Sequence, residues 1–234
     1  MLKDLESVQK KIQRIERAAR VAGDKEAKKT LEVATVYLKH LESGNPARTV
    51  PVDTDDRKIM ADCFLLTEKP VLYVCNVDEK SVVNGNKYVD MVKEAVKNEK
   101  AEILVIAAAI ESEIAQLETF EERQMFLQDL GLNESGVSKL IKAAYRLLEL
   151  QTYFTAGEKE VRAWTFHKGM TAPQAAGIIH TDFEKGFIKA EVIKYDDFVK
   201  FGSESACRDN GKLSIEGKDY IVQDGDIMHF RFNV

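Results

Sequence analysis

Residues 69–79 read KPVLYVCNVDE, and the arrangement of the middle of the chain follows from this stretch. Its apolar, β-branched run at residues 71–75 is typical of a buried strand. A second run, Ile-Leu-Val-Ile at residues 103–106, has the same character and leads into three alanines. Helical patterns stand between and after the two runs, at residues 88–98, 120–127 and 137–150. The alternation of strand and helix predicts a parallel α/β sheet, of which two strands would form only one edge.

Ligand-binding residues are expected where the two strands end, because α/β proteins bind ligands at the carboxyl ends of parallel strands. The first strand ends in Asn-Val-Asp-Glu at residues 76–79, and the second in the alanines at 107–109. An asparagine side chain carries both a donor and an acceptor, so Asn76 can fix the loop and also contact a purine N7. A carboxylate nearby can accept from ring N–H or exocyclic amine groups. Asparagine at a strand end is also a common turn residue, so this pattern alone leaves both interpretations open.

The amino-terminal part predicts two amphipathic helices. Apolar residues recur there at spacings of three and four, first at Leu5, Val8, Ile12, Ile15, Ala19 and Ala22, and then at Ala27, Leu31, Ala34, Leu38 and Leu41. Gly23 suits the left-handed end of one helix, and Asp24 can cap the next. Residues 43–46, Ser-Gly-Asn-Pro, end the second helix. Two short helices with a tight break predict an antiparallel hairpin, and part of an ordinary helical bundle is the alternative.

Positive charge is concentrated on this hairpin. Between residues 10 and 29 there are eight Lys or Arg residues and three acidic ones, in a chain whose formal net charge is −5. Clustered cations can contact RNA phosphates, and the candidates here are Lys10, Lys11, Arg14, Arg17 and Arg20. A solvated helix face is the alternative, and from the charges alone it is the simpler interpretation.

The chain from residue 151 onward predicts a separate α+β module. Strand patterns occupy residues 161–167 and 187–195, and a short helix with Thr171 as its N-cap spans residues 171–179. Turn signals then separate three further short strands at residues 213–215, 220–222 and 228–232. Several short strands and one helix in a segment of this length suggest a module of the size of ubiquitin.

The composition of the 234 residues excludes several classes of protein. With 44% hydrophobic and 31% charged residues, the chain can bury a core, and its net charge argues against a general nucleic-acid-coating protein. No apolar run approaches the roughly 18 residues of a membrane span, and no secretory signal opens the chain. We therefore expect a cytoplasmic protein without a membrane partner. The three cysteines and four histidines are scattered, which predicts neither a disulfide nor a metal site.

Several stretches together strongly resemble the YchF-type Obg-like ATPases of the P-loop GTPase superfamily. They are KPVLYVCNVDE, VIAAAIESEIAQL at 105–117, the run at 150–193 that contains TFHKGM and FEKGF, and the ending EGKDYIVQDGDIMHFRFNV. LKDLESVQKKIQRIE at residues 2–16 resembles the helical insertion of that family. The resemblance covers essentially the whole chain. It implies a coiled-coil hairpin at residues 1–65, the carboxyl-terminal part of a nucleotide-binding G domain at 66–150, and a β-grasp TGS domain at 151–234.

The resemblance also implies a nucleotide site. The superfamily usually carries N-K-x-D for base specificity, whereas residues 76–79 match the altered N-x-x-E form that is associated with ATP over GTP. Asn76, Val77 and Glu79 would then bind the base, with Ala107 and Ala108 behind it. Guanine offers N1–H and an amine to a carboxylate, whereas adenine offers an N1 lone pair and an N6 amine. A longer Glu side chain moves that charge, and main-chain groups near Val77 could then bind the adenine edge. Ala107 stands where the superfamily usually has Ser or Cys, which leaves only main-chain contacts there.

ATP or GTP with Mg²⁺ is the cofactor set that the resemblance implies for the full-length protein, and a ribosome or RNA is the implied partner. The sequence contains no G-x-x-x-x-G-K-[ST] motif and no strand ending in D-x-x-G, the parts that hold phosphates and Mg²⁺. In the family these parts precede the helical insertion. We therefore expect the chain to begin in mid-domain, to carry no catalytic residue and to be inactive as an ATPase. The alternative function is an RNA- or ribosome-binding module that acts through the basic hairpin and the TGS domain.

Overall fold

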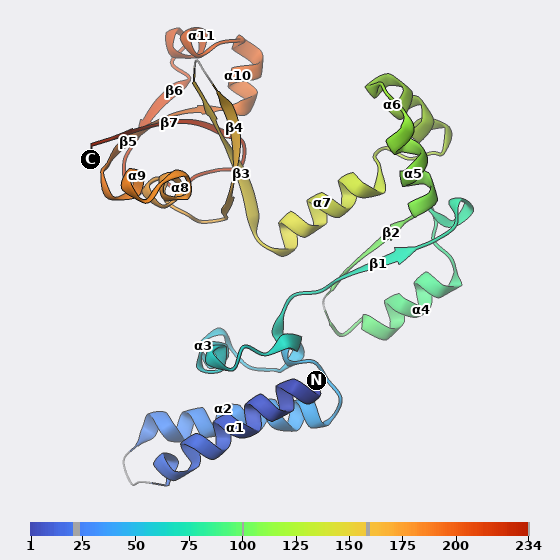
Figure 1. The fold of residues 1–234 in the computed structure, drawn as a ribbon, viewed down its shortest axis with the longest axis vertical. Helices are drawn as coiled ribbons and strands as arrows, with labels where there is room; N and C mark the ends of the chain where they lie inside the picture. The colour runs from blue at the N-terminus through green and yellow to red at the C-terminus, as the bar shows by residue number, and fades with distance from the viewer. Residues whose placement is uncertain (21–23, 100, 158–159, 234) are drawn as a thin grey trace. The chain divides into compact units, whose positions relative to one another are not determined.

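A computed structural model describes residues 1–20, 24–99, 101–157 and 160–233. Figure 1 shows its elements from the N-terminus in blue to the C-terminus in red. Contacts between residues divide the chain into two compact units, Met1–Ile141 and Lys142–Val234. The two units are described separately below.

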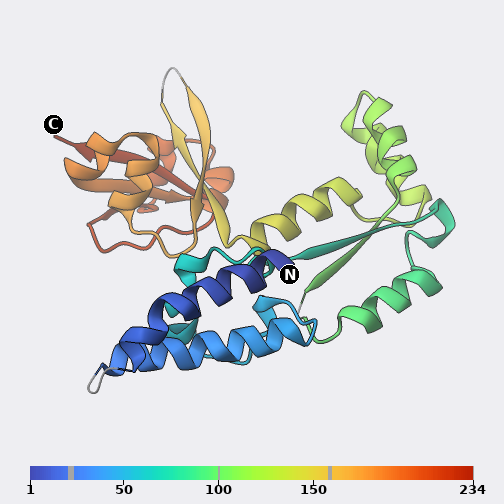
Figure 2. The same cartoon turned by 60° about the horizontal axis from the view of Figure 1, so that its bottom comes forward.

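The first unit opens with helices α1 (Leu2–Ala19) and α2 (Lys25–Glu42), which lie side by side and run in opposite directions (Figures 1 and 2). Both helices are confirmed. Their facing apolar stripes form a buried cluster that contains Val8, Val33, Ala34, Tyr37 and Leu41. The predicted cap of α2 is also confirmed, because the Asp24 side chain accepts from the Ala27 N–H at 2.8 Å. The predicted helix end at Gly23 lies outside the described residues.

A segment of short helices follows the hairpin and closes its base. It comprises η1 (Ala47–Thr49), α3 (Thr54–Ile59), η2 (Ala61–Cys63) and η3 (Leu66–Glu68). The Asp4 carboxylate of α1 accepts hydrogen bonds from the Leu66 and Thr67 N–H groups, both at 2.8 Å, and from the Thr67 hydroxyl at 2.7 Å. Asp4 is only 1% exposed, so this contact fixes the start of α1 to the end of the segment in a dry environment.

Two parallel strands continue the first unit, as the apolar runs predict. Strand β1 (Leu72–Asn76) pairs with β2 (Glu102–Ile106) in a two-stranded sheet, with Leu72 opposite Glu102 and Asn76 opposite Ile106. The connection contains η4 (Glu79–Ser81) and α4 (Lys87–Val96), and α5 (Ala108–Gln116), α6 (Phe120–Asp129) and α7 (Gly136–Leu147) follow β2.

Two details of this part differ from expectation. The run around β1 predicted a buried strand, but Val74 is 42% exposed and Cys75 is only half-buried. Within the described residues β1 has β2 as its one strand neighbour, so much of its surface lacks a covering layer. The second difference is α5 (Ala108–Gln116), a helix that the sequence patterns did not predict.

The second unit is a five-stranded mixed sheet with helices. Its strands lie in the order β4-β3-β7-β5-β6, with β3 parallel to β7 and the other pairs antiparallel. Its core joins Tyr153, Phe166 and Met228 of the sheet to Ala172 and Ala175 of α8. The elements are β3 (Leu150–Ala156), β4 (Val161–His167), α8 (Ala172–Ile179), α9 (Thr181–Lys185), β5 (Phe187–Lys194), α10 (Tyr195–Phe201), α11 (Glu204–Asp209), β6 (Leu213–Glu216) and β7 (Asp226–Phe232).

The predicted helix with Thr171 as its cap is confirmed as α8, including a capping box with Gln174. The strands at 161–167, 187–195, 213–215 and 228–232 are confirmed within a residue or two as β4, β5, β6 and β7. The prediction of a strand at residues 220–222 is wrong, because that segment makes only one isolated bridge, between Thr171 and Ile221. Strand β3 was not predicted.

Candidate functional site

The two strand ends singled out in the sequence meet in space. The Asn76 side-chain oxygen Oδ1 accepts a hydrogen bond of 3.0 Å from the Ala108 N–H, at the first residue of α5. One residue further on, the Val77 N–H donates to the Ile106 carbonyl at 2.8 Å. The parallel register, which puts Asn76 opposite Ile106, makes both bonds possible. Residues 76–79 and 107–108 therefore form one corner, which we call the strand-end corner.

The loop after Asn76 is held in shape by its own aspartate. The Asp78 carboxylate accepts from the Ser81 N–H at 3.0 Å and caps η4. Gly85, with a φ of +73°, closes the turn through a 2.7 Å bond from its N–H to the Ser81 carbonyl. A positive φ of this size is one that glycine adopts without strain. Because Asp78 is committed to the loop, the exposed Glu79 is the carboxylate of this corner that can meet a ligand.

The other side of the corner is the start of α5. Ala107 is 1% exposed and belongs to the buried cluster with Ile110 and Ile114, whereas Ala108 is exposed. Ala107 occupies the N-cap position but has no side chain that could accept from the first-turn N–H groups. Asn76 supplies that acceptor from the neighbouring strand. The capping of α5 is thus a contact between residues 32 positions apart.

Helix α5 is in turn fixed to the start of α7 by a carboxylate. Glu111 accepts from the Gly136 N–H at 2.6 Å and from the Val137 N–H at 3.1 Å. A Cβ atom on Gly136 would lie 2.8 Å from Glu111 Oε1 and 2.8 Å from the Ile106 Cγ2 atom. A side chain at Gly136 would therefore fit only if Glu111 or Ile106, which support the corner, moved.

Substituting Gly136→Ala should lower the free energy of unfolding of the first unit by about 1–3 kcal/mol, because the new methyl group must displace Glu111 or Ile106. Urea denaturation followed by circular dichroism measures the change. The matched control is Gly217→Ala, where an added Cβ would have no heavy atom within 4 Å, and where we expect a change below about 0.5 kcal/mol. Equal effects of the two substitutions would contradict the packing described for Gly136.

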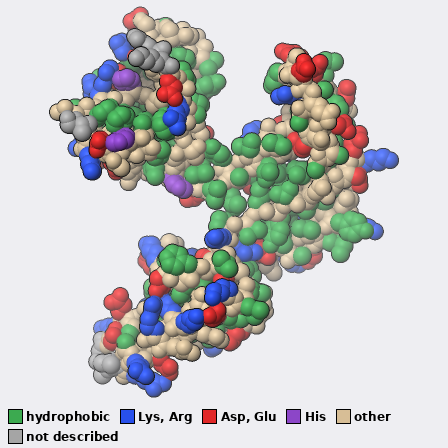
Figure 3. Space-filling model, in the orientation of Figure 1, with side chains coloured by type: hydrophobic (Ala, Val, Ile, Leu, Met, Phe, Trp, Pro, Cys, Tyr) green, Lys and Arg blue, Asp and Glu red, His purple; other side chains and the backbone are tan. Residues whose placement is uncertain are grey.

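The candidate cations of the hairpin fall into two groups. Lys10, Arg14, Arg17 and Arg20 are exposed, and Figure 3 shows Lys and Arg side chains interspersed with acidic ones over this part of the molecule. Lys11 differs, because it is 7% exposed and its ammonium donates to the Ile59 carbonyl at 2.5 Å and to the Asp62 carboxylate. Lys11 therefore has partners inside the chain, and its exposed neighbours are better placed to meet a phosphate.

Asp62 is a residue that the sequence did not single out. Its carboxylate bonds Lys11 and also accepts from Arg14 at 2.9 Å. The hydrogen bond from Lys11, supported by Arg14, holds the pKa of this carboxyl below its usual range. Elsewhere on the hairpin, Lys10 pairs with Glu6 and Arg20 with Glu16, both at 2.5 Å between neighbouring turns of α1. Such exposed pairs are weak and exchange readily with other anions.

The described residues contain no group of three or more His, Cys, Asp or Glu side chains placed to hold a metal ion. None of the helices in that part of the chain is both long enough and apolar enough to cross a membrane.

Comparison with known proteins adds to this geometry. Residues 150–233 match the family model YchF-GTPase_C, described as a protein of unknown function (DUF933). Residues 150–233 therefore match the carboxyl-terminal domain of YchF proteins. Similarity to YchF proteins also extends over the rest of the chain. It is 53% identical over 233 residues to the "Ribosome-binding ATPase YchF" of Haemophilus ducreyi, and 50% identical over 236 residues to the protein of that name from Bacillus subtilis.

Both alignments cover 100% of this chain but only 63% and 64% of those YchF proteins. The chain thus spans less than two thirds of the length of these relatives. Among solved structures, the YchF GTPase of Schizosaccharomyces pombe superposes with a TM-score of 0.86 at 34% identity. That match covers 98% of this chain and 62% of the YchF GTPase. The mixed α/β architecture described above is therefore one that a YchF structure shares.

Proposed function

We propose that the strand-end corner is the base-recognition part of a purine-nucleotide site, and that the whole protein is an Obg-like ATPase. The observation that carries this proposal is the 3.0 Å hydrogen bond from Ala108 to Asn76, which joins the carboxyl ends of two parallel strands. Ligands of α/β proteins bind at such ends. The names of the YchF relatives, which describe ribosome-binding ATPases, support the assignment.

The Asn76 side chain has one polar group, its Nδ2, that remains available to a base. Its Oδ1 accepts from the Ala108 N–H, so the Nδ2 amide N–H is the group that can donate to N7 of a purine. N7 is an acceptor in both adenine and guanine. Asn76 would therefore position a purine without choosing between the two.

The choice of adenine would come from Val77 and Glu79. Because the Val77 N–H is engaged by Ile106, its carbonyl is the main-chain group of this residue that can contact a base. A carbonyl accepts from the N6 amine of adenine, whereas the O6 of guanine would repel it. Glu79 is exposed, and its longer side chain can stay away from the adenine N1 lone pair. These contacts favour ATP over GTP, with Ala107 and Ala108 behind the base.

The finer organisation is part of the same proposal. We assign residues 1–65 to a coiled-coil insertion, 66–150 to the carboxyl-terminal part of a G domain, and 151–234 to a TGS domain. The order β4-β3-β7-β5-β6, with its parallel central pair, suits a β-grasp fold. The whole protein would use Mg²⁺ with its nucleotide, which neutralises phosphate charge during hydrolysis. We assign no residue of this chain to Mg²⁺, and we propose that these 234 residues alone do not hydrolyse ATP.

Two substitutions at Asn76 separate its two roles. Asn76→Asp keeps an acceptor for the Ala108 N–H but replaces the N7 donor with a carboxylate oxygen, whereas Asn76→Ala removes both. Both should weaken ATP binding about tenfold or more, while only Asn76→Ala should also lower the free energy of unfolding, by about 1 kcal/mol. Isothermal titration of ATP into a protein that spans the length of the YchF relatives measures the affinity, and urea denaturation of this chain measures the stability.

The matched control is Asn84→Asp, which makes the same chemical change at an exposed residue of the same connection. It should leave ATP binding unchanged within about twofold. Undiminished ATP binding by Asn76→Asp would remove Asn76 from the base-recognition site.

A second function of a different class has its own observation. The exposed Lys10, Arg14 and Arg17 lie along α1 and the exposed Arg20 is its C-cap residue, in a protein whose net charge is negative. We propose that they contact phosphates of ribosomal RNA, and that the carboxyl-terminal unit takes part in the same binding. The name "ribosome-binding ATPase" of the relatives supports this partner. Nucleotide binding and ribosome binding are compatible functions of one full-length protein.

A further inference from the structure

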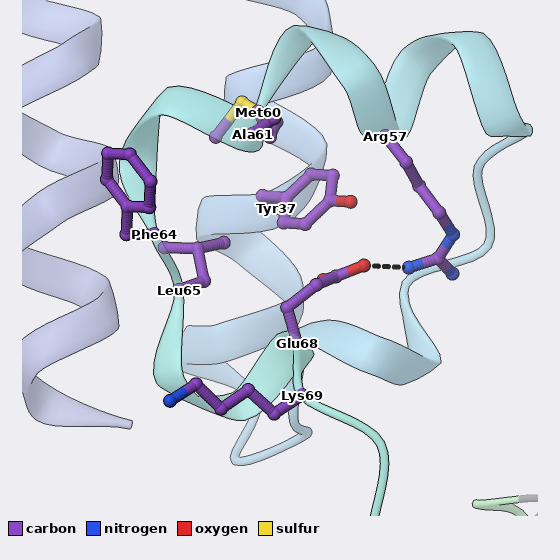
Figure 4. A pocket seen from close by; sticks show the side chains of 8 residues that line it. All are labelled: Tyr37, Arg57, Met60, Ala61, Phe64, Leu65, Glu68 and Lys69. Carbon is purple, nitrogen blue, oxygen red and sulfur yellow. Dashed lines mark hydrogen bonds and ion pairs between the residues drawn. The ribbon is translucent and has the colours of Figure 1, made fainter. Parts of the chain in front are cut away.

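A pocket at the base of the helical hairpin has no part in either proposed function. Its volume is about 230 Å³, and it lies between α2 and the segment of short helices that follows (Figure 4). Met60, Ala61, Phe64 and Leu65 give it an apolar wall. Its polar lining comes from Tyr37, Arg57, Glu68 and Lys69.

Two polar atoms of this lining are buried without a partner. They are the Tyr37 hydroxyl, on a side chain that is 0% exposed, and the Glu68 Oε2 atom. Figure 4 shows the hydroxyl and the carboxylate directed toward the same side of the pocket. A buried donor or acceptor that forms no hydrogen bond costs roughly 1–3 kcal/mol, so such groups normally have partners. The two atoms therefore mark a place where a partner belongs.

The first unit contains a similar trio in which the bonds are complete. Tyr73 donates from its hydroxyl to Glu99 Oε2 at 2.9 Å, and Arg48 Nε donates to the same atom at 3.1 Å. In the pocket, Arg57 likewise pairs with Glu68, through its other oxygen Oε1. There, however, no hydrogen bond joins the tyrosine to the glutamate, and the pocket adjoins both. The tyrosine hydroxyl thus reaches the glutamate directly in the first trio but not at the pocket.

The charges and the shape define what can fit. Arg57 already offsets the negative charge of Glu68, and the exposed Lys69 adds a positive charge at the rim, so the site does not call for a cation. The unpartnered carboxylate oxygen would repel an anion. Burial, with the Glu68 charge adding to it, raises the pKa of Tyr37 to about 12, so the hydroxyl keeps its proton at neutral pH and can donate. The volume is many times what a single water needs. It is smaller than a typical site for a drug-sized molecule, roughly 300–1,000 Å³.

We propose that this pocket binds a small neutral aromatic carboxamide, whose N–H donates to Glu68 Oε2 and whose carbonyl accepts from the Tyr37 hydroxyl. A primary carboxamide presents a donor and an acceptor side by side, so one group satisfies both buried atoms. The ring would lie against Met60, Leu65 and the side chain of Phe64. Phe64 is 85% exposed and has a φ of +47°, a conformation that is uncommon for a bulky residue and tends to be retained where it serves a ligand.

Benzamide is the probe that tests this proposal on the 234-residue chain. Titration followed by chemical-shift changes should show saturable binding with a dissociation constant of roughly 1 mM, as expected of so small a ligand. Methyl benzoate, which keeps the ring and the carbonyl but has no N–H donor, should bind about three- to tenfold more weakly. Absence of saturable benzamide binding, or equal binding of the two compounds, would overturn the proposal.

Three variants locate the binding. Tyr37→Phe removes only the unpartnered hydroxyl and should weaken benzamide binding about three- to tenfold while leaving the thermal midpoint unchanged or higher. Tyr73→Phe makes the same change at the hydroxyl that is already bonded to Glu99, and should leave benzamide binding within about twofold. Ala61→Leu fills part of the pocket from its exposed rim and should also weaken binding, which keeps the test valid if Tyr37→Phe does not fold. Binding that is unaffected by both Tyr37→Phe and Ala61→Leu would contradict the proposed site.

Discussion

Replacing Arg14, Arg17 and Arg20 together by glutamine should lower the affinity for ribosomes about 100-fold at 0.1 M salt. Each neutralised phosphate contributes roughly 0.7–0.9 to the slope of log affinity against log salt, so losing three contacts should reduce that slope by about 2. Affinities that converge near 1 M salt then differ by about two powers of ten at 0.1 M. Co-sedimentation with purified ribosomes at several salt concentrations measures both quantities.

The control for this triple variant removes the same number of positive charges elsewhere. Lys58, Lys93 and Lys97 are exposed, and each pairs with an acid three residues away, as Arg20 pairs with Glu16 four residues away. Replacing these three lysines by glutamine should leave the salt slope within about 0.5 of its original value. If both triple variants lose affinity equally, the binding reflects overall charge and the assignment to α1 is wrong.

Asp4→Ala should lower the free energy of unfolding of the hairpin by about 3 kcal/mol. The carboxylate is 1% exposed and accepts from three donors of Leu66 and Thr67, so its removal leaves two part-buried N–H groups without this acceptor. Urea denaturation measures the loss. Asp55→Ala is the matched control, because Asp55 is exposed and pairs with the exposed Lys58, and its removal should cost less than about 0.5 kcal/mol.

The same contact makes the stability depend on pH. Burial by itself raises the pKa of Asp4, but the hydrogen bonds from Thr67 and Leu66 outweigh burial and leave the pKa below its ordinary value of 3.8. A carboxyl whose pKa is lower in the folded state contributes stability above its unfolded pKa and loses it as the pH falls. The difference in unfolding free energy between the original chain and Asp4→Ala should therefore be full at pH 7 and shrink below about pH 4. A difference that stays constant down to pH 2.5 would show that Asp4 does not titrate in this way.

Local signals in the sequence predicted much of the fold. The spacing of apolar residues found α1 and α2, and Asp24 and Thr171 were found as caps because their side chains act within three residues of their own position. The apolar runs found β1 and β2 and their parallel order. These features depend on neighbours along the chain, so a pattern can report them.

The features that the sequence did not predict depend on residues distant along the chain or on backbone conformations that no residue type signals. Helix α5 lacks a local cap, since its acceptor is Asn76 of another strand. The helix predicted to reach residue 150 ends earlier as α7, and β3 begins directly after Glu149, which has a φ of +52° although the stretch has neither Gly nor Pro to signal a break. In β5 the apolar Ile188 is 57% exposed, at the point where the pairing register shifts between Phe187 and Lys189.

In the candidate site, too, local features could be predicted from the sequence, whereas contacts between distant residues could not. The types of residue at the strand-end corner could be named from the sequence, and their assignment to a base stays a prediction. The engagement of Val77 by Ile106 leaves its carbonyl for a ligand, and only the register of the strands could reveal this. The burial of Lys11 against Asp62 joins residues 51 positions apart, so charge counting alone grouped Lys11 with its exposed neighbours.

The bond between Asp4 and Thr67 also bears on how this helical segment could be moved between proteins. Because the two residues touch, some sixty residues of chain leave and return at nearly the same point. A graft with these two residues as its borders would need no spacer to connect its ends. It could therefore be inserted at a tight surface turn of a recipient fold without widening that turn.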